Sequence, residues 1–518
     1  MKKLFLNVAL VLLAVVADGR CCAARTKEFP VRAFHLDFRT EVMTLDAMRS
    51  LVDRLSARGI NTLVMEWEAS FPFDRHAVLS KNSAFTREEV SAFIDYCGQR
   101  GIEVIPLQNC FGHCEYILRN ERYRNLRESV KDPSQVCPSK IGEAVACFSE
   151  IFAEVAALHP SDYFHIGADE TYLLGECAAC RAKADREGKS RLFVDYVKAM
   201  CDIVRDLGKT PMIWADIILK HPEALDELPD DLIVVDWNYG WEPDRFGNLS
   251  NLLSRDVKLW GASAMRSAPD NIYLTQWKKH FDNLAVYVEF AREHDYAGMI
   301  ETSWSTSGTY GYLLDDGYEI LEMQPIRLVY PMSAFEVLEA ACCEAFTVDA
   351  PFDPEPFVRR YACEELGLDD AGADVLWRYF TMPQERVTVT AAGAKDALGR
   401  ELSEVLDECL RMRGELSRIH PRKHADQVAH YLLMLDLRIE HLRFREIESR
   451  CQAADFDRSR AAGLAAELRD LLGASEALDR RFCRLNEGYL KPQEIEYINT
   501  MRTMKMKALH DRLTSIAR

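Results

Sequence analysis

The stretch FHIGADETYLLG, residues 164–175, places two adjacent acidic side chains, Asp169 and Glu170, after a run of apolar and small residues. Removing a carboxylate from water costs free energy, and a second negative charge beside it increases that cost. The pair therefore either caps a helix or performs chemistry. Two carboxyl groups whose pKa values are driven apart are what cleavage of a glycosidic bond requires, because one group donates a proton while the other stabilises the developing positive charge.

Short apolar runs rich in branched residues alternate with helix-like segments from residue 31 to residue 343. The pattern predicts strands at residues 32–38, 61–68, 102–108, 162–169, 210–216, 231–237, 257–263 and 297–304. It predicts helices at residues 43–58, 86–100, 139–158, 189–207, 221–228, 243–255, 278–294 and 325–343. Eight strand–helix repeats are typical of a (β/α)8 TIM barrel. A doubly wound open sheet would use the same alternation, but no glycine-rich phosphate loop follows the first strand.

Polar and aromatic residues recur at the carboxyl ends of the predicted strands. These residues are Glu66, Glu68, Asn109 to His113, Asp169, Glu170, Trp214, Asp216, Trp237, Tyr239 and Trp304. In a parallel barrel these strand ends converge on the face where active sites are built. Sugar rings expose an apolar face that packs on large aromatic side chains such as indole. We therefore expect a carbohydrate-cleaving pocket at this end of the barrel.

The pattern changes after residue 354, where long helical periodicities rich in Arg, Glu and Leu replace the alternation. The sequence predicts a signal peptide at residues 1–24, a catalytic barrel at residues 25–345 and a C-terminal all-α helical domain at residues 346–518. The helical domain is expected to pack on the barrel or on a second copy of the chain in a homodimer. The sequence leaves both arrangements open.

The net charge of the chain bears on its binding partners, and its first 24 residues bear on its cellular location. The chain carries 64 basic and 82 acidic residues, a formal charge of −18, which argues against a nucleic-acid partner. Residues 1–24 combine two lysines, an apolar run and small residues, which is the pattern of a secretory signal. We expect an exported protein, periplasmic or at the cell surface, without a membrane span. A lipid anchor at Cys21 or Cys22 is the alternative to a free mature chain.

Sixteen cysteines are scattered along the chain, and several lie in patterns typical of buried helix faces. The pair Cys177-Ala178-Ala179-Cys180 has the spacing of metal ligands or of a redox couple. A local disulfide or two plain thiols would have the same spacing, and the sequence leaves these alternatives open. We expect no metal among the catalytic residues and no cofactor.

The motif HIGADE at residues 165–170 resembles the HxGxDE signature of glycoside hydrolase family 20, the β-N-acetylhexosaminidases. Four segments resemble the hexosaminidase D branch of that family: EWEASFPF at 66–73, EVIPLQNCFGHCEYIL at 103–118, HIGADETYLLG at 165–175 and LWGASA at 259–264. The resemblance covers about residues 29–345. It implies an exo-acting, retaining β-N-acetylhexosaminidase that removes terminal β-linked GlcNAc or GalNAc from glycans.

In that family the acetamido group of the substrate attacks the anomeric carbon and forms an oxazolinium ion, so no carboxylate nucleophile is required. The resemblance implies that Glu170 is the general acid and base, that Asp169 holds the acetamido N–H, and that Tyr239 donates to the acetamido carbonyl. It implies substrate-binding roles for Arg32, His113, Trp214, Trp237 and Trp304. Apolar walls and the adjacent Asp169 are expected to raise the pKa of Glu170, so that this group starts protonated.

Two departures from the family leave the choice between gluco- and galacto-configured sugars open. Trp304-Ser305-Thr306 places a threonine where many relatives carry glutamate, and Tyr239-Gly240-Trp241 lacks the aspartate found after this tyrosine in many relatives. The candidates for the missing hydroxyl contacts are Glu66, Glu68, Tyr310 and Glu322.

Two other classes of function compete with this interpretation. One is a glycan-binding protein with silent chemistry, which the presence of all of Asp169, Glu170 and Tyr239 disfavours. The other is a metal-dependent barrel hydrolase that uses Glu66, Glu68, His113, His165 and Asp169. Its histidines lack the HxH or HExxH spacing of such sites.

Overall fold

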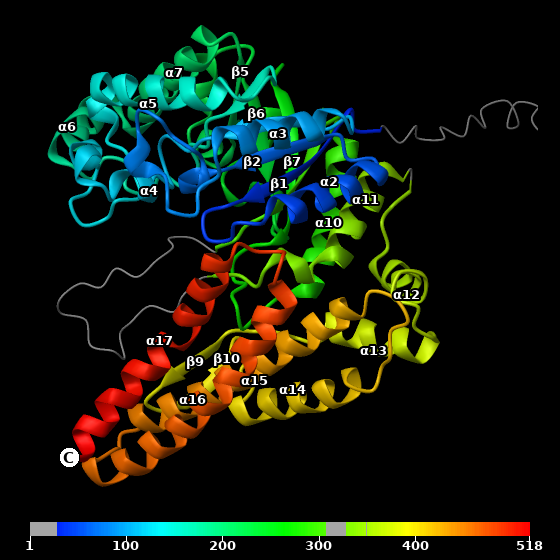
Figure 1. Cartoon of the computed structure of the whole chain (residues 1–518). Coiled ribbons are helices and arrows are strands. Elements are labelled where there is room, and N and C mark those ends of the chain that lie inside the picture. Colours follow the sequence, from blue (N-terminus) through cyan, green and yellow to red (C-terminus); the bar gives the residue numbers. More distant parts are fainter. Residues whose placement is uncertain (1–27, 307–327, 349) are drawn as a thin grey trace, which may run out of the picture.

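The computed structural model describes residues 28–306, 328–348 and 350–518, and in this part of the chain eight parallel strands form a closed barrel (Figure 1). The strands are β1 (Val31–Asp37), β2 (Thr62–Glu66), β3 (Glu103–Leu107), β4 (Tyr163–His165), β5 (Thr210–Trp214), β6 (Ile233–Trp237), β7 (Lys258–Arg266) and β8 (Gly298–Ser303). Each strand pairs with the next one along the chain, and β8 closes the barrel against β1. The predicted TIM barrel is confirmed, with a strand in each predicted position.

Helices surround the barrel. They are α2 (Leu45–Ala57), α3 (Arg87–Gly98), α4 (Glu115–Leu118), α5 (Ile141–Ala156), α6 (Ala178–Glu187), α7 (Lys189–Asp206), α8 (Asp216–Lys220), α9 (Ser250–Leu253), α10 (Trp277–Glu293) and α11 (Glu336–Thr347). Helix α6 is not among the predicted helices, because it buries a single cysteine, Cys180, and has no apolar stripe. The helices predicted at 221–228 and 243–255 are short turns of helix rather than full elements. The helix predicted at 325–343 is α11, which runs past the expected domain boundary at residue 345.

The interior of the barrel is filled by side chains. Its lining comprises Ala33, Val64, Ile105, Leu107, Met212, Ile233, Val235, Trp260, Ala262 and Ile300. Trp260 is fully buried in this interior, with its ring centroid 5.8 Å from that of Tyr163. Eight-stranded barrels are normally packed in this way, so they offer no channel. A ligand is therefore bound at the carboxyl face and not inside the barrel.

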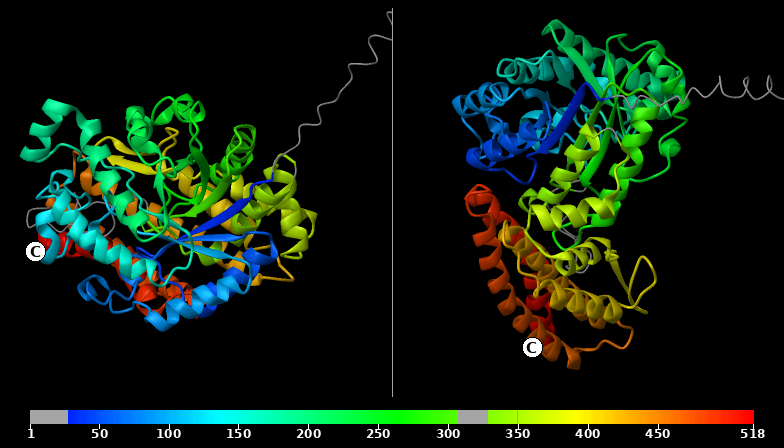
Figure 2. Two further views of the ribbon diagram at one scale, coloured as in Figure 1. Left: turned by 90° about the horizontal axis from the view of Figure 1, so that it is seen from above. Right: turned by 90° about the vertical axis from the view of Figure 1, so that its right-hand side faces the viewer.

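The C-terminal region forms a layer of helices beside the barrel, and the longest of them extend away from it (Figures 1 and 2). These helices are α12 (Pro354–Glu364), α13 (Asp370–Thr381), α14 (Leu402–Leu416), α15 (Ala425–Gln452), α16 (Arg458–Asn486) and α17 (Pro492–Ala517). The predicted helical region is confirmed, but it is not all-α. The strands β9 (Val387–Thr390) and β10 (Gly393–Asp396) form an antiparallel hairpin against α15. Strands of four residues are too short to show a clear alternating pattern in the sequence.

The helical region is joined to the barrel near the carboxyl end of β1, beside a buried ion pair of the barrel itself. Arg266 at the end of β7 pairs with Glu41 in the loop after β1, and Glu41 also accepts the backbone N–H of Met332 at 2.9 Å. Nearby, the backbone N–H of Thr44 donates to the carbonyl oxygen of Tyr489 at 2.8 Å. The C-terminal helices are therefore attached at the face that carries active sites in this fold.

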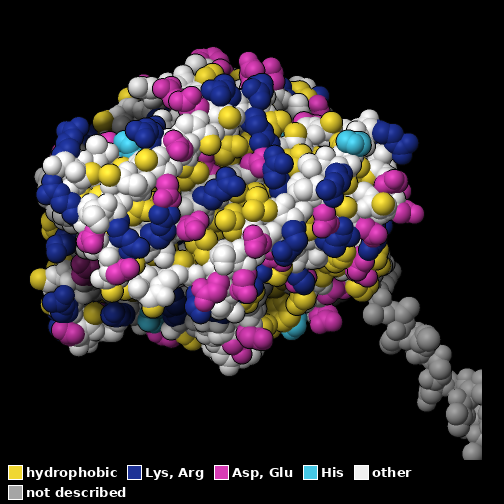
Figure 3. Space-filling view, turned by 90° about the horizontal axis from the view of Figure 1, so that it is seen from below, with side chains coloured by type: hydrophobic (Ala, Val, Ile, Leu, Met, Phe, Trp, Pro, Cys, Tyr) yellow, Lys and Arg dark blue, Asp and Glu magenta, His cyan; other side chains and the backbone are white. Residues whose placement is uncertain are grey.

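The outer surface mixes charges of both signs. On the face seen in Figure 3, Lys and Arg side chains alternate with Asp and Glu side chains, and such interspersed charges keep the local field weak. In the described part of the chain, no helix has the length and apolar character needed to cross a membrane. The predicted signal peptide, with Cys21 and Cys22, lies outside the described residues.

Glu41→Gln is expected to lower the free energy of unfolding by about 3 kcal/mol, because it leaves the buried Arg266 guanidinium without a counter-charge. The midpoint of urea unfolding measures this loss. Glu355→Gln is the matched control: it breaks a surface ion pair with Arg359, and its midpoint should hardly move. Equal midpoints for the two variants would contradict a structural role for the buried pair.

Candidate active site

A pocket of about 190 Å³ opens at the carboxyl face of the barrel. It is lined by Arg39, His113, Asp169, Glu170, Tyr172, Trp214, Trp237, Tyr239, Trp241, Arg245, Phe246, Ser267, Ala268, Trp304 and Thr306. This space would hold roughly six water molecules at about 30 Å³ each, which suits one small ring and not an extended chain. Of the site residues predicted from the sequence, all except Arg32 lie on its wall.

The loops after β3 and β4 touch each other at two places where the chain carries glycine. A Cβ on Gly112 would lie 2.1 Å from the carbonyl oxygen of Asp169. A Cβ on Gly167, whose φ is +71°, would lie 2.0 Å from Asn109 Oδ1. Neither distance is compatible with a side chain, so both positions require glycine. This close approach brings the ends of β3 and β4 into one unit.

Three residues with side chains adopt left-handed backbone conformations at this contact. They are His113, Ala168 and Glu170, with φ of 54°, 70° and 49°. Such conformations cost on the order of 1–3 kcal/mol each and cluster at functional sites. They are found here where Asp169 and Glu170, although adjacent in the chain, both line the same pocket.

His113 lies between the two acids. Its Nε2 is 3.3 Å from Asp169 Oδ2 and 3.3 Å from Glu170 Oε2. Burial lowers the pKa of His113, but the charge of Asp169 and the hydrogen bonds to both carboxylates outweigh burial. The net pKa therefore lies well above the ordinary 6.5. The imidazole is a cation at neutral pH and offsets one of the two adjacent negative charges.

Glu170 has a pKa shift opposite to the expected one. Burial raises the pKa of Glu170, but the hydrogen bond and charge of His113 lower it, with a further hydrogen bond donated by Tyr172 Oη to Oε1 at 2.6 Å, and the net pKa is about 2. The expectation that apolar walls and Asp169 keep Glu170 protonated is therefore wrong here. The physical reason is the histidine cation, which comes from a different loop. The proton of this group of three resides on His113.

Asp169 lines the pocket, and one of its carboxylate oxygens is buried and unpaired in the described part of the chain. Its Oδ2 faces His113, whereas Oδ1 is buried and accepts a hydrogen bond from none of the described residues. A buried acceptor without a donor costs about 1–3 kcal/mol, and more when it is charged. Asp169 therefore retains an unused acceptor on a side chain that lines the pocket.

Asp216, at the end of β5, supports the backbone of this acid pair. Its Oδ2 accepts the backbone N–H of Glu170 at 3.1 Å. Burial first, and the charge of Asp169 second, raise the pKa of Asp216 to about 7. Asp216 therefore holds a proton for much of the time at neutral pH, which avoids a third full negative charge beside the pair.

Aromatic rings form much of the remaining pocket wall. The rings of Trp214 and Trp304 have centroids 5.9 Å apart, and those of Trp237 and Tyr239 have centroids 5.1 Å apart. Trp304 Nε1 donates to Tyr239 Oη at 2.9 Å, so the hydroxyl accepts from the indole and keeps its own proton to donate. Burial raises the pKa of Tyr239 above its ordinary 10, which preserves that proton at neutral pH.

Arg32 does not lie at the pocket, so its expected contact with a sugar is wrong. It sits near the amino end of β1, where its Nε donates to the carbonyl oxygen of Gly59 at 2.6 Å. Arg39 lies just past the carboxyl end of the same strand and lines the pocket, held by Asp37 at 3.0 Å. Its guanidinium is 5.0 Å from the ring centroid of Trp304. An arginine directly after a strand end is the sequence signal that identifies it.

Six further residues of the wall had no predicted role: Tyr172, Trp241, Arg245, Phe246, Ser267 and Ala268. Three of them belong to the loop after β6. Trp241 packs edge-on against Trp237 at 5.3 Å, and the Arg245 guanidinium lies 4.6 Å from the Trp241 ring centroid. The aromatic character of this loop, WNYGWEPDRF, was visible in the sequence directly after a strand end.

The structure describes some, but not all, of the residues expected to contact the outer hydroxyls of the sugar. Thr306 lines the pocket. Glu66 and Glu68 are buried and do not line it. Tyr310 and Glu322 lie outside the described residues.

The residues of the metal-dependent alternative do not converge on one point. Glu66 is 3.2 Å from His35 Nε2 and accepts from Asn109 Nδ2 at 2.7 Å. His165 accepts the backbone N–H of Gly167 at 3.0 Å through Nδ1, and burial holds its pKa well below the ordinary value. These side chains therefore hold the ends of the strands together.

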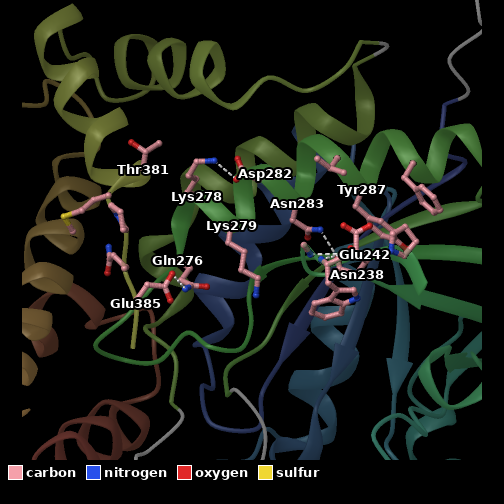
Figure 4. A pocket seen from close by; sticks show the side chains of 18 residues that line it. Asn238, Glu242, Gln276, Lys278, Lys279, Asp282, Asn283, Tyr287, Thr381 and Glu385 are labelled. Carbon is pink, nitrogen blue, oxygen red and sulfur yellow. Dashed lines mark hydrogen bonds and ion pairs between the residues drawn. The ribbon is translucent and has the colours of Figure 1, made fainter. Parts of the chain in front are cut away.

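A second, larger cavity of about 590 Å³ lies between α10 and the segment that precedes β9 (Figure 4). Its polar groups are largely paired with one another: Lys278 pairs with Asp282, and Gln276 donates to Glu385 at 2.9 Å. Trp241 lines both cavities, so the loop after β6 separates them. The adjacent acid pair faces the smaller cavity, and the larger one is not the place for two-carboxyl chemistry.

Comparison with known proteins agrees with this geometry. The family description "Glycosyl hydrolase family 20, catalytic domain" matches residues 29–303, more than half of the chain. Hexosaminidase D of Bos taurus is 28% identical over 303 residues, which cover 55% of this chain and 87% of the bovine protein. Hexosaminidase D of Homo sapiens is 28% identical over 306 residues, which cover 55% of this chain and 62% of the human protein.

The solved structures that match this chain have lower sequence identity to it than these two relatives. A chitobiase of Flavobacterium johnsoniae has 17% sequence identity and a TM-score of 0.49, with 94% of this chain and 72% of that chain covered. A beta-N-acetylhexosaminidase of Bacteroides fragilis has 20% identity and a TM-score of 0.44, with 54% of this chain and 61% of that chain covered. The family assignment rests on the sequence match and not on these structures. With that match across the whole barrel, the chain belongs to glycosyl hydrolase family 20 and is a glycoside hydrolase of the β-hexosaminidase type.

Proposed function

We propose that this hydrolase is an exo-acting, retaining β-N-acetylhexosaminidase that removes terminal β-linked GlcNAc or GalNAc by substrate-assisted catalysis. The observation that carries the proposal is the position of Asp169, whose Oδ1 is an acceptor without a donor among the described residues, in the wall of a pocket that is also lined by indoles. An acetamido N–H is such a donor, and its methyl group is apolar enough to pack against the rings. The small volume of the pocket supports recognition of one terminal sugar.

In this mechanism Asp169 accepts the acetamido N–H and Tyr239 donates its hydroxyl proton to the acetamido carbonyl. The carbonyl oxygen attacks the anomeric carbon while Glu170 protonates the glycosidic oxygen, so the bond to the leaving group breaks as the oxazolinium ring forms. Glu170 is then a carboxylate and takes a proton from water. The water oxygen attacks the anomeric carbon and opens the oxazolinium ring, so the configuration at this carbon is retained overall. The charge of Asp169 stabilises the cationic ring.

His113 stores the proton that Glu170 uses as an acid. His113 Nε2 lies 3.3 Å from Glu170 Oε2, and the raised pKa of His113 favours the proton on the imidazole when the pocket is empty. A bound sugar removes water from both groups, and desolvation disfavours the separated charges of an imidazolium and a carboxylate. The proton then moves to Glu170, which becomes the general acid only when a substrate is in place.

Arg39, and not Arg32, binds the ring hydroxyls of the sugar in this proposal. Its planar guanidinium lines the pocket and is fixed by Asp37, so its remaining donors are pre-oriented. With Thr306 where many relatives carry glutamate, neither sugar epimer is favoured, so the proposal includes both GlcNAc and GalNAc. The place of action is proposed to be outside the cytoplasm, on the basis of the signal pattern in residues 1–24.

Glu170→Gln is expected to fold normally and to lower turnover of an aryl N-acetyl-β-hexosaminide by about 1,000-fold or more, because it removes both the acid and the base. Steady-state kinetics and circular dichroism measure the two effects. Azide should partly restore turnover to Glu170→Ala, because it attacks the intermediate without needing a base. Glu187→Gln, at the exposed end of α6, is the control. Near-normal turnover of Glu170→Gln would show the assignment to be wrong.

The internal nucleophile makes the N-acetyl group essential. Nitrophenyl β-glycosides of GlcNAc and GalNAc should be cleaved with kcat/KM about 100-fold or more above that of the glucoside with a 2-hydroxyl. A thiazoline that mimics the cyclised intermediate should inhibit competitively. Asp169→Asn should weaken that inhibition, because the charge facing the ring is lost. Equal cleavage of sugars with and without the N-acetyl group would rule the mechanism out.

The pH dependence of kcat/KM should reflect the shared proton. In the native enzyme activity should fall as the pH rises through the pKa of His113, which lies above 6.5. In His113→Asn the proton must come from Glu170 itself, whose ordinary pKa of 4.5 burial raises, so the basic limb should move to lower pH. His76→Asn, a buried histidine beside Tyr123, serves as control. An unchanged basic limb in His113→Asn would contradict the proton store.

A further inference from the structure

Three cysteines and one glutamate meet at a point away from the pocket. They are Glu128, Cys137, Cys177 and Cys180, whose ligand-type atoms all lie within 4.8 Å of one another. Cys137 Sγ is 3.6 Å from Cys177 Sγ and 3.5 Å from Cys180 Sγ. Thiolates placed tetrahedrally at about 2.3 Å from a zinc ion are about 3.8 Å apart. The sulfur atoms thus have the spacing of a common ligand sphere.

The charge of Glu128 has no protein counter-ion. The side chain is 4% exposed, and among residues 28–306, 328–348 and 350–518 no lysine, arginine or histidine forms an ion pair with it. Its Oε1 accepts the backbone N–H of Cys177 at 2.8 Å, and its Oε2 lies 3.1 Å from Cys180 Sγ. A buried carboxylate beside thiols is costly unless a cation compensates it. A metal ion supplies that cation.

Further hydrogen bonds are directed at the sulfur atoms. Cys177 is the N-cap of α6, and its Sγ accepts the backbone N–H of Cys180 at 3.3 Å. Ser139 Oγ lies 3.0 Å from Cys180 Sγ. Donors of this kind stabilise thiolates and orient metal ligands. The spacing C-x-x-C at the start of a helix, which the sequence left open, therefore belongs to a larger built site.

A disulfide explains less of this arrangement. Cys137 is nearly equidistant from Cys177 and Cys180, so a bond to either one leaves the other sulfur beside Glu128. It also leaves the buried carboxylate without a positive partner. An exported protein can form disulfides, which makes this alternative a necessary outcome of the test.

We propose that Cys137, Cys177, Cys180 and Glu128 bind one structural Zn²⁺ ion. Three thiolates and a carboxylate complete the four-coordinate sphere typical of closed zinc sites, and their summed charge is that of a four-cysteine site. Softer thiolate ligands favour zinc over magnesium or calcium. The site lies outside the catalytic pocket and does not depend on the proposed sugar specificity.

The ion would fasten the loop that carries the catalytic acids. The segment from Glu170 to Cys177 leads from the pocket to the metal site, and along it the backbone N–H of Leu173 donates to Gln135 Oε1 at 2.8 Å. Val136, which follows Gln135, donates its backbone N–H to the carbonyl oxygen of Phe111 at 2.9 Å. Phe111 precedes His113 by two residues. Zinc would thus hold the β3 and β4 loops together behind the contact between His113 and Glu170.

The test measures metal in the full-length protein purified without chelator. Elemental analysis should find about one zinc per chain in the native protein and in Cys363→Ser, a half-buried cysteine on α12 that serves as control. Cys180→Ser and Glu128→Gln should retain about 10-fold less zinc against a competing chelator. Cobalt exchange should produce thiolate charge-transfer bands and the visible spectrum of a tetrahedral site.

Three results would overturn the proposal. They are a zinc-free native protein with Cys137 in a disulfide, a zinc-free native protein with three alkylatable thiols, and full zinc retention by Cys180→Ser. If the variants fail to fold, the zinc content and cobalt spectrum of the native protein decide. Because these readouts are independent of glycosidase activity, a failed activity assay cannot be mistaken for failure of the metal site.

Discussion

The contact of His113 with two neighbouring carboxylates is the interaction on which this site depends. Asp169 and Glu170 are adjacent in the chain and face one small pocket, so their mutual repulsion would expel one charge or protonate it. A cation 3.3 Å from each carboxylate allows both to stay ionised while a proton remains within reach. In the proposed mechanism, His113 holds the proton in the free enzyme and transfers it to Glu170 when a bound sugar excludes water.

Backbone geometry makes this contact available. Gly112 and Gly167 permit the loops after β3 and β4 to approach more closely than any side chain would allow. The left-handed turns at Ala168 and Glu170 lie on either side of Asp169 and let adjacent side chains share one cavity. Asp216 then anchors the backbone of Glu170 and, with its pKa raised to about 7, adds little negative charge of its own. The two glycines and the residues with left-handed backbone are therefore as necessary for the position of the acids in the pocket as the acids are for its charge.

The barrel and the location of its pocket could be predicted from sequence, because strand periodicity and strand-end polarity are local signals. The lowered pKa of Glu170 could not be predicted, since His113, the residue that outweighs the effect of burial, lies on another loop. Arg32 lies near the amino end of β1 and Arg39 lies just past its carboxyl end. Choosing between them requires the exact bounds of the strand, which the sequence does not give. Cys137 lies far from Cys177 in the chain, so the C-x-x-C spacing alone could not reveal the third thiol.

The strain in the β4 loop explains why that loop needs an anchor beyond the pocket. Ala168 and Glu170 in this loop, and His113 in the β3 loop that it contacts, cost about 1–3 kcal/mol each, which is a large part of the roughly 5–15 kcal/mol that stabilises a typical domain. Single hydrogen bonds such as the one from Leu173 to Gln135 contribute about 1 kcal/mol each and cannot offset that cost alone. A zinc ion bound by thiolates contributes on the order of 10 kcal/mol, enough to hold the turn. The catalytic geometry and the proposed metal site therefore follow from one constraint: the loop that aims Asp169 and Glu170 is unstable unless it is fixed at both ends.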